Sequence, residues 1–349
     1  MKKVKVIEIL WTVVFTACLI FLSGCSEGKT PASSSGTAPG SGSRGNFESQ
    51  DKKAFTLNVS SPSDLTGVVG YWVAEEQGFA KEENIKFNYV GAVQSGQLVA
   101  SVVAGKIDIG GAHVNRTIAG INAGAKIKAV AANTETTREI PHMTFVALEK
   151  SNINTPKDIL GRKIGIAAFG GCNEYTTYAY LLKNGINEPK GKFKISIIQS
   201  PPKLEQALRQ GEIDIAGLHE NPDSVLEKGG LKILFTDYDV WQTIGGATPY
   251  YFSERFIKEH PDVVRRFVRV IAKTNNWVNA NPDKAREITA RRGKVDIGII
   301  RRSHFAPDAV IKEETVQVWI DLLTKFKEIK AGIKTQDIYT NEFNDLAKK

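Results

Sequence analysis

Gly105-Lys-Ile-Asp-Ile-Gly-Gly-Ala-His-Val-Asn115 and Gly211-Glu-Ile-Asp-Ile-Ala-Gly-Leu-His-Glu-Asn221 align without a gap, and seven of their eleven positions are identical. Gln94-Ser95 and Gln199-Ser200 precede the two copies at spacings that differ by one residue. Each copy has the pattern of a short apolar strand, a polar turn and the start of a helix. The match predicts two lobes of the same construction, unless Gly-x-Ile-Asp-Ile is merely a common way to enter a buried strand.

Short apolar strands alternate with amphipathic stretches around both copies, which is typical of an α/β protein with mainly parallel sheets. Strands are expected at 55–60, 85–90, 107–110 and 127–132, and in a second series at 143–148, 163–168, 193–199, 213–217 and 232–235. Helices are expected at 67–78, at 96–104 and from about Asn115. The last hundred residues are predicted to be largely helical, because 261–279 carries apolar residues at helical spacing.

The first 24 residues have the order of a secretory signal peptide of the lipoprotein type. Lys2, Lys3 and Lys5 precede a mostly apolar run that ends in Leu22-Ser-Gly-Cys25. This ending resembles the bacterial lipobox, in which the cysteine is acylated and becomes the new N-terminus. We therefore expect Cys25 to be lipidated and to hold the protein on the extracytoplasmic face of a membrane, periplasmic or on the outer surface of the cell.

Residues 25–54 are predicted to be the lipidated cysteine and a disordered tether. The segment is rich in Ser, Gly and Pro and carries too few apolar groups to build a core. Its root-mean-square reach is about 30 Å on the flexible-coil relation. Such a tether keeps the folded part near the membrane without confining it to the lipid surface.

Cysteine usage and charge narrow the functional classes. Cys18 leaves with the signal peptide and Cys25 is assigned to the lipid, so Cys172 is the one remaining thiol. We therefore expect no disulfide framework and no cysteine-based zinc cluster. The net charge of +8 becomes +6 without the signal peptide, whose three lysines and Glu8 contribute +2. Because the basic residues are interleaved with acids, we predict a solvated basic surface and no nucleic-acid partner.

Several motifs together resemble one family, the substrate-binding proteins of ABC importers for nitrate, sulfonates, taurine and thiamine-pyrimidine precursors, also called NMT1/THI5-like. The motifs are Tyr71-Trp-Val-Ala-Glu-Glu-Gln-Gly-Phe79, the two Ile-Asp-Ile strands and Asn154-Thr-Pro-Lys-Asp-Ile-Leu-Gly-Arg-Lys163. The resemblance implies a type II periplasmic-binding-protein fold, with two α/β lobes joined by a two-crossing hinge. It places lobe 1 at 55–140 and 246–349, and lobe 2 at 141–245.

Ligands of open α/β sheets bind beyond the carboxyl ends of the strands, where helix N-termini offer unpaired amides. Four loops of this sequence are expected at such positions. The candidate ligand-binding residues on them are Ser60, Ser61, Asp64, His113, Asn115, Gly170, Gly171, Cys172, Asn173, His219 and Asn221. Gly170 and Gly171 allow close approach of the backbone to a ligand.

The repeat places a His-x-Asn at one strand end in each lobe. In the functional interpretation His113 and His219 clamp a polar or anionic ligand from both sides; in the structural one they only shape turns. Asn115 and Asn221 are expected to cap their helices. A zinc site of both histidines with Glu220 matches no metal motif, so we predict no metal and no cofactor.

Where sulfonate receptors of the family commonly have a serine or threonine after the glycine, this chain has Cys172-Asn-Glu174. Glu174 would oppose a bound anion, which leaves room for a zwitterion or a neutral heterocycle. Aromatic residues expected near the same loops could stack on a ring: Tyr71, Trp72, Phe169, Tyr175, Trp241, Tyr250 and Tyr251.

The predicted function is that of an extracytoplasmic solute-binding lipoprotein of an ABC importer and not of an enzyme. The protein is expected to be monomeric and to hold a small polar or anionic organic solute, similar to a sulfonate, taurine or nitrate, between its two lobes; its other partners are the permease and its ATPase. The alternatives are a receptor for a thiamine-pyrimidine precursor, a sensor that docks to a membrane receptor, and a pyrimidine synthase of the same family. The enzyme's cysteine-rich motif is absent, and the sequence has no phosphate-binding loop, nucleophile elbow or His-Glu-x-x-His helix.

Overall fold

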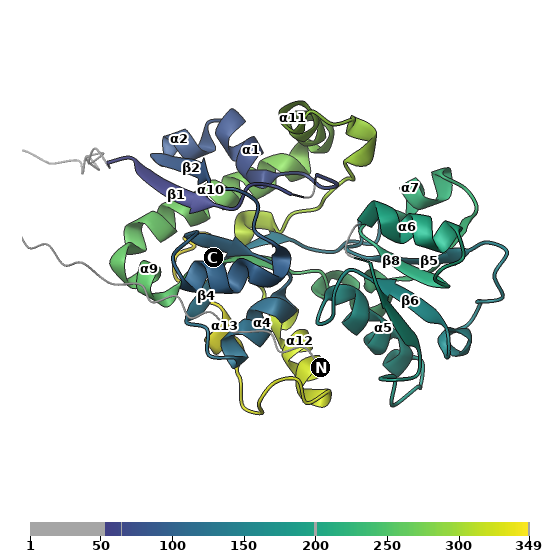
Figure 1. The fold of residues 1–349 in the computed structure, drawn as a ribbon. Coiled ribbons are helices and arrows are strands. Elements are labelled where there is room, and N and C mark those ends of the chain that lie inside the picture. Colours follow the sequence, from purple (N-terminus) through teal and green to yellow (C-terminus); the bar gives the residue numbers. More distant parts are fainter. Residues whose placement is uncertain (1–52, 64, 199–200, 348–349) are drawn as a thin grey trace, which may run out of the picture. The chain divides into compact units, whose positions relative to one another are not determined.

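Two five-stranded mixed sheets form the framework of the chain (Figure 1). The computed structural model describes residues 53–63, 65–198 and 201–347. The lobe 1 sheet has the order β2-β1-β3-β10-β4 and the lobe 2 sheet the order β7-β6-β8-β5-β9. The strands are β1 (Phe55–Val59), β2 (Ile85–Tyr89), β3 (Ile109–Gly111), β4 (Ile127–Thr134), β5 (Thr144–Leu148), β6 (Lys163–Ile166), β7 (Lys194–Ile197), β8 (Ile215–Leu218), β9 (Leu231–Thr236) and β10 (Thr248–Ser253). The α/β fold class with two lobes is confirmed.

The helices pack around the sheets. They are α1 (Gly70–Glu76), α2 (Phe79–Glu82), α3 (Leu98–Val103), α4 (Val114–Asn122), α5 (Cys172–Lys183), α6 (Pro201–Arg209), α7 (Pro222–Glu227), α8 (Asp237–Trp241), α9 (Glu254–Glu259), α10 (Pro261–Ala280), α11 (Pro282–Gly293), α12 (Glu313–Lys325) and α13 (Thr335–Ile338), with short 3₁₀ turns at Ser95–Gln97, Pro156–Ile159, Gln242–Ile244, Ile297–Ile299 and Pro307–Ala309. The helix expected at 67–78 is shorter in the structure, because α1 ends at Glu76. Gly78, with a φ of +80°, breaks the helix and is the N-cap of α2. Within the described part of the chain, no helix is long and apolar enough to span a membrane.

The repeated Ile-Asp-Ile motif has the same role in both sheets. Asp108 accepts a hydrogen bond from the backbone N–H of Asn58 at 2.7 Å and donates its own N–H to the Asn58 carbonyl at 2.8 Å. Asp214 makes the same pair of bonds with Lys163, at 2.8 and 2.8 Å. Each aspartate thus extends the parallel pairing at the entry of the third strand, which explains why the motif occurs twice.

The strand β10 was not predicted, and it is an interior strand of the lobe 1 sheet, the fourth in spatial order. It runs antiparallel between β3 and β4, with Tyr251 opposite Gly110 and Ala129. In the lobe 2 sheet β5 has the same place, antiparallel between β8 and β9. The chain passes from one sheet to the other twice, from β4 to β5 and from β9 to β10, and each crossing delivers the antiparallel strand of the sheet that it enters.

The predicted helix at 261–279 is confirmed as α10, which covers the lobe 1 sheet with a continuous apolar face. Phe267 is fully buried on it and contacts Tyr250 and Phe87 with ring centroids 5.6 and 6.5 Å apart. Tyr71 and Tyr250, considered above for ring stacking, lie 5.4 Å apart in the same core. These aromatic residues therefore stabilise lobe 1.

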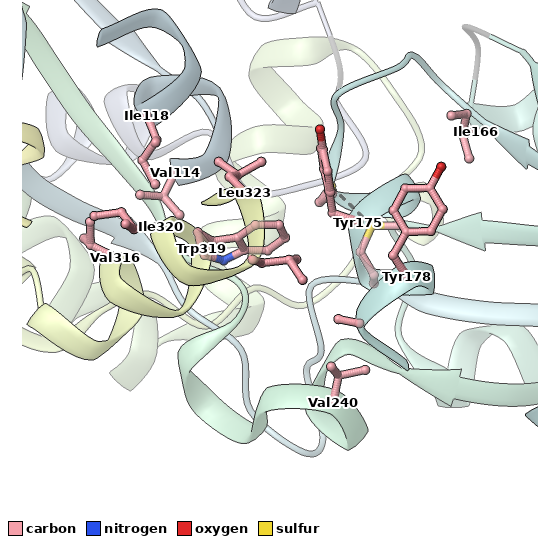
Figure 2. Packing of buried hydrophobic residues seen from close by; sticks show 14 of the residues in the cluster. Val114, Ile118, Ile166, Tyr175, Tyr178, Val240, Val316, Trp319, Ile320 and Leu323 are labelled. Atoms are coloured by element: carbon pink, nitrogen blue, oxygen red, sulfur yellow. Dashed lines mark hydrogen bonds between the residues drawn. The ribbon is translucent and has the colours of Figure 1, made fainter. Parts of the chain in front are cut away.

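A second apolar cluster contains residues of both lobes and lies next to the strand ends. Figure 2 shows the ring of Trp319 projecting from α12 toward Tyr175 of α5, and the two ring centroids are 6.5 Å apart. Val114 at the start of α4 belongs to the same cluster. The cluster forms an apolar base beneath the polar residues described next.

Candidate functional site

Three histidines meet where the predicted loops of the two lobes face each other. His113 follows β3 in lobe 1 and His219 follows β8 in lobe 2, as the repeat predicts. His142, from the crossing between β4 and β5, lies between them, with its ring centroid 5.0 Å from that of His113 and 4.9 Å from that of His219. The repeat could not reveal His142, because it belongs to neither copy.

Cys172 joins this histidine cluster from the first residue of α5. Its Sγ lies 3.6 Å from Nε2 of His219 and 3.7 Å from Sδ of Met143. The side chain is 8% exposed, and burial raises the pKa of the thiol to about 11. The thiol is therefore protonated at neutral pH in the ligand-free protein.

His113 is held on both of its ring nitrogens. Nδ1 lies 3.1 Å from Oδ1 of Asn115, and Nε2 lies 3.1 Å from the carbonyl oxygen of Gly245, which also accepts the indole N–H of Trp319 at 2.9 Å. Burial lowers the pKa of His113 to about 3, although both oxygen partners favour the charged form. This neutral ring connects lobe 1 to the second crossing, so the structure favours a positioning role over direct clamping of a ligand.

Asn115 makes a hydrogen bond between the lobes. Its Nδ2 donates to the carbonyl of Gly170 in lobe 2 at 2.8 Å. The expectation that Asn115 caps α4 is wrong, since His113 has the N-cap position of that helix. Asn221 has the expected N-cap position of α7, but its side chain makes no capping hydrogen bond. Oδ1 of Asn221 is buried and has no partner among the described residues.

The loop before α5 is shaped by glycine and by Glu174. Gly170 has a φ of +70° and Gly171 is the N-cap of α5. Oε2 of Glu174 accepts the N–H of Gly170 at 2.7 Å, so one amide at this helix terminus is already bound to a carboxylate. Asn173 is buried beneath the loop, with its Nδ2 3.4 Å from the carbonyl of Gly217.

Arg116 was not predicted, although it follows the flagged Asn115 directly. Its guanidinium reaches from α4 to within 3.4 Å of the position that a Cβ on Gly171 would occupy. Among the described residues no carboxylate forms an ion pair with it. A cation of lobe 1 thus faces the first turn of α5 in lobe 2.

The remaining predicted residues have hydrogen-bond or ion-pair partners outside the histidine cluster or lie outside the described part. Oγ of Ser60 accepts the N–H of Val93 at 2.9 Å, and Oγ of Ser61 accepts that of Gly91 at 3.1 Å, so both tie together the ends of β1 and β2. Asp64 and Cys25, like the whole predicted signal peptide and most of the tether, lie outside the described residues. Glu220 forms an ion pair with Lys228 at 2.7 Å and does not join the histidines.

The crossing that carries His142 is fixed by a buried carboxyl group. Oδ1 of Asp237 accepts the N–H of Met143 at 2.9 Å, and Oδ2 accepts the hydroxyl of Thr136, which in turn accepts the N–H of His142 at 3.2 Å. Nε2 of His142 is buried without a hydrogen-bond partner in the described part of the chain. Burial and the neighbouring histidines hold the pKa of His142 well below its ordinary value, so this ring is neutral.

The site thus combines the neutral imidazoles of His113 and His142, the ring of His219, a protonated thiol, the Arg116 guanidinium and backbone amides at the start of α5. Such a set offers hydrogen bonds and the positive charge of Arg116 to a polar ligand. A cysteine nucleophile requires the thiolate, which the raised pKa of Cys172 disfavours.

Comparisons with known proteins agree with this architecture. A family profile described as NMT1/THI5 like matches residues 65–285. The taurine-binding periplasmic protein of Escherichia coli (strain K12) is 27% identical over 243 residues, which make up 66% of this chain and 69% of that protein. The solved structure of the alkanesulfonate-binding protein SsuA from Xanthomonas axonopodis pv. citri, bound to MOPS, is similar with a TM-score of 0.64 at 16% identity, covering 82% of this chain and 99% of that one.

One enzyme has the same fold. The desulfurization enzyme DSZB is similar with a TM-score of 0.59 at 15% identity, covering 84% of this chain and 98% of that one. The fold therefore does not by itself separate binding from catalysis. The profile covers more than half of the chain and agrees with the sequence relative: the chain belongs to the NMT1/THI5-like family of ABC-transporter substrate-binding proteins and has the two-lobed fold of periplasmic binding proteins.

Proposed function

We propose that this protein is the extracytoplasmic solute-binding component of an ABC importer and that it holds a small polar or anionic organic solute between its lobes. The observation that carries the proposal is that the loops at equivalent strand ends of the two sheets lie close together. The loops after β3 and β8 and the start of α5 come together, and Asn115 bonds to Gly170 from the opposite lobe. A solute at this edge contacts both lobes, and its binding energy can then favour closure.

The charges favour a solute that carries an anionic group together with hydrogen-bond donors. Arg116 supplies a positive charge beside the backbone amides of α5. The carboxylate of Glu174 already accepts the N–H of Gly170, so a second full negative charge beside this loop is disfavoured. A sulfonate with an amino group, such as taurine, meets both conditions. The taurine-binding and alkanesulfonate-binding names of two similar proteins support this class.

A thermal-shift and calorimetric screen of taurine, alkanesulfonates, nitrate and aminopyrimidines tests the proposal. Specific binding raises the melting temperature with solute concentration as ln(1 + [L]/Kd). Arg116→Gln is expected to weaken binding of an anionic solute by about tenfold or more, since a charge-assisted hydrogen bond is lost. Arg209→Gln, which removes a surface pair with Glu205, is the matched control and should leave the affinity unchanged. Equal affinities of the parent and Arg116→Gln would contradict the assignment of the anion site.

A heterocyclic solute is the second candidate, because Phe169 is 63% exposed in the loop beside Gly170. An exposed ring at that place can stack on a planar ligand. Phe169→Ala should weaken an aminopyrimidine and spare taurine. Weaker taurine binding with unchanged aminopyrimidine binding would contradict the heterocycle proposal.

Lipid anchoring through Cys25 and a monomeric state belong to the same proposal. The importer partner needs the receptor close to the membrane, and a lipid with a flexible tether provides this. Cys25→Ala should move the protein from the membrane fraction to the soluble fraction. Retention of the variant in membranes would show that another element anchors it.

A further inference from the structure

We propose that His142, Cys172 and His219 form a binding site for one thiophilic d-block metal ion of the zinc type. The inference stands apart from the identity of the organic solute, because it rests on the protein's own donor atoms. Nε2 or Nδ1 of each histidine and Sγ of the cysteine lie within 4.8 Å of one another, and this group is the one such cluster of potential metal ligands among the described residues.

The distance between the cysteine and one histidine matches a shared ion. Zinc binds sulfur at about 2.3 Å and imidazole nitrogen at about 2.05 Å, so two such ligands on a tetrahedral ion are about 3.6 Å apart. Sγ of Cys172 and Nε2 of His219 are 3.6 Å apart. The wider separations in the cluster require side-chain movements of about 1 Å to reach ligand distances.

His142 supplies the donor that the protein otherwise leaves unused. Its Nε2 is buried and has no partner among the described residues, and burial of an unpaired polar atom is costly. Coordination would satisfy this nitrogen. The backbone on both sides of the ring is already fixed, since Thr136 accepts the N–H of His142 and Asp237 accepts that of Met143. Such outer contacts orient metal ligands.

The donor set indicates which ions fit. Two imidazoles and a thiolate select zinc, cobalt or copper and reject magnesium and calcium, which need oxygen ligands. Sδ of Met143 lies 3.7 Å from Sγ of Cys172 and adds a second soft atom beside the cluster. Binding replaces the thiol proton by the metal, and the proton passes to solvent. Three protein ligands leave a fourth position of a tetrahedral ion for water or solute.

A cobalt titration of the full chain tests the site. The chain carries Cys18→Ser and Cys25→Ser, so that Cys172 is the one thiol, and it is first freed of metal with a chelator. We expect one Co²⁺ per chain, a thiolate-to-cobalt charge-transfer band with the visible bands of a tetrahedral ion, displacement by Zn²⁺ and no competition by Mg²⁺. Cys172→Ser should abolish the charge-transfer band. His142→Gln and His219→Gln should each weaken Co²⁺ binding by at least about tenfold.

His260→Gln is the matched control, because His260 packs against Phe55 and Phe256 away from the cluster. Its Co²⁺ affinity should stay within about twofold of the parent, since a distant site contributes independently. Binding without the thiolate band, or an unchanged affinity in the His142 and His219 variants, overturns the proposal.

Protection of the thiol provides a test that needs no site variant. Zn²⁺ should slow the alkylation of Cys172 by at least about tenfold, because a coordinated and buried thiolate is shielded. An unchanged alkylation rate overturns the proposal. Metal binding is measured without organic solute, and solute binding is measured in the presence of a chelator. A negative result for the metal site therefore does not contradict the proposed solute-binding function, and a negative result for the solute does not contradict the metal site.

Discussion

Asp237 connects the two chain crossings through a single carboxylate. It begins α8 after β9, yet it accepts the N–H of Met143 and the hydroxyl of Thr136 on the other crossing. It is 1% exposed, and burial raises its pKa from 3.8 to about 6. The folded state therefore binds a proton more tightly than the unfolded state.

Asp237→Asn should change the pH dependence of stability. The stabilisation from the raised pKa is fully present below about pH 4 and is lost as the pH rises through 6, and the pKa difference corresponds to about 3 kcal/mol. Because asparagine does not titrate, the parent should lose about 3 kcal/mol of unfolding free energy relative to Asp237→Asn between about pH 3 and pH 7. Urea unfolding at several pH values measures this. The exposed Asp223→Asn is the control, and a constant difference between parent and Asp237→Asn would contradict the prediction.

Single residues of the site were predictable where the sequence repeats and where a loop follows a predicted strand, as for Gly170 and Cys172. His113 and His219 occupy matching loops, so comparing the two copies identified both. His142 and Arg116 have no counterpart in the alignment, and their roles depend on a crossing and on the reach of a long side chain between lobes. Such long-range proximity leaves no local pattern. The ligand-binding roles of all these residues remain predictions.

At the scale of elements, the two aspartates of the repeat extend the sheets at equivalent places. Asp108→Ala should lower the free energy of unfolding by about 1–3 kcal/mol, because the half-buried N–H of Asn58 loses its partner. Asp214→Ala should cost about 1 kcal/mol or less, since water can reach the exposed N–H of Lys163. Asp321→Ala, on the outer face of α12, is the control. Urea denaturation decides, and a greater loss for Asp214→Ala than for Asp108→Ala would refute the account.

Most strands and the long helix α10 were predicted from apolar runs and helical periodicity, because burial on these elements follows a local period. The strand β10 was missed because no local period in the sequence marks it. It is six residues long, contains Pro249, and pairs with β3 and β4, which are more than a hundred residues earlier in the chain. Its strand character depends on neighbours that no short window includes.

At the scale of the whole molecule, the contact between the lobes should respond to solute. Asn115→Ala removes the hydrogen bond to Gly170, which is worth about 0.5–1.5 kcal/mol, together with the bond to Nδ1 of His113, so the solute affinity should fall by at least about two- to tenfold. X-ray scattering should show a larger radius of gyration for the ligand-free variant than for the parent, and saturating solute should bring the two together. Asn184→Ala, in the outer part of lobe 2, should scatter like the parent. Identical ligand-free profiles of the parent and Asn115→Ala would remove this bond from the closing mechanism.

The position of β10 also determines the order in which the polypeptide can complete its two halves. All five strands of the lobe 2 sheet lie in one stretch between Thr144 and Thr236, whereas the lobe 1 sheet lacks its fourth strand in spatial order until Thr248–Ser253 is available. During N-to-C synthesis, the edges of β3 and β4 that face β10 therefore stay unpaired while more than a hundred residues are added. The half of the protein that begins first is completed last, and its exposed strand edges are the place where chaperones or proteases would act first.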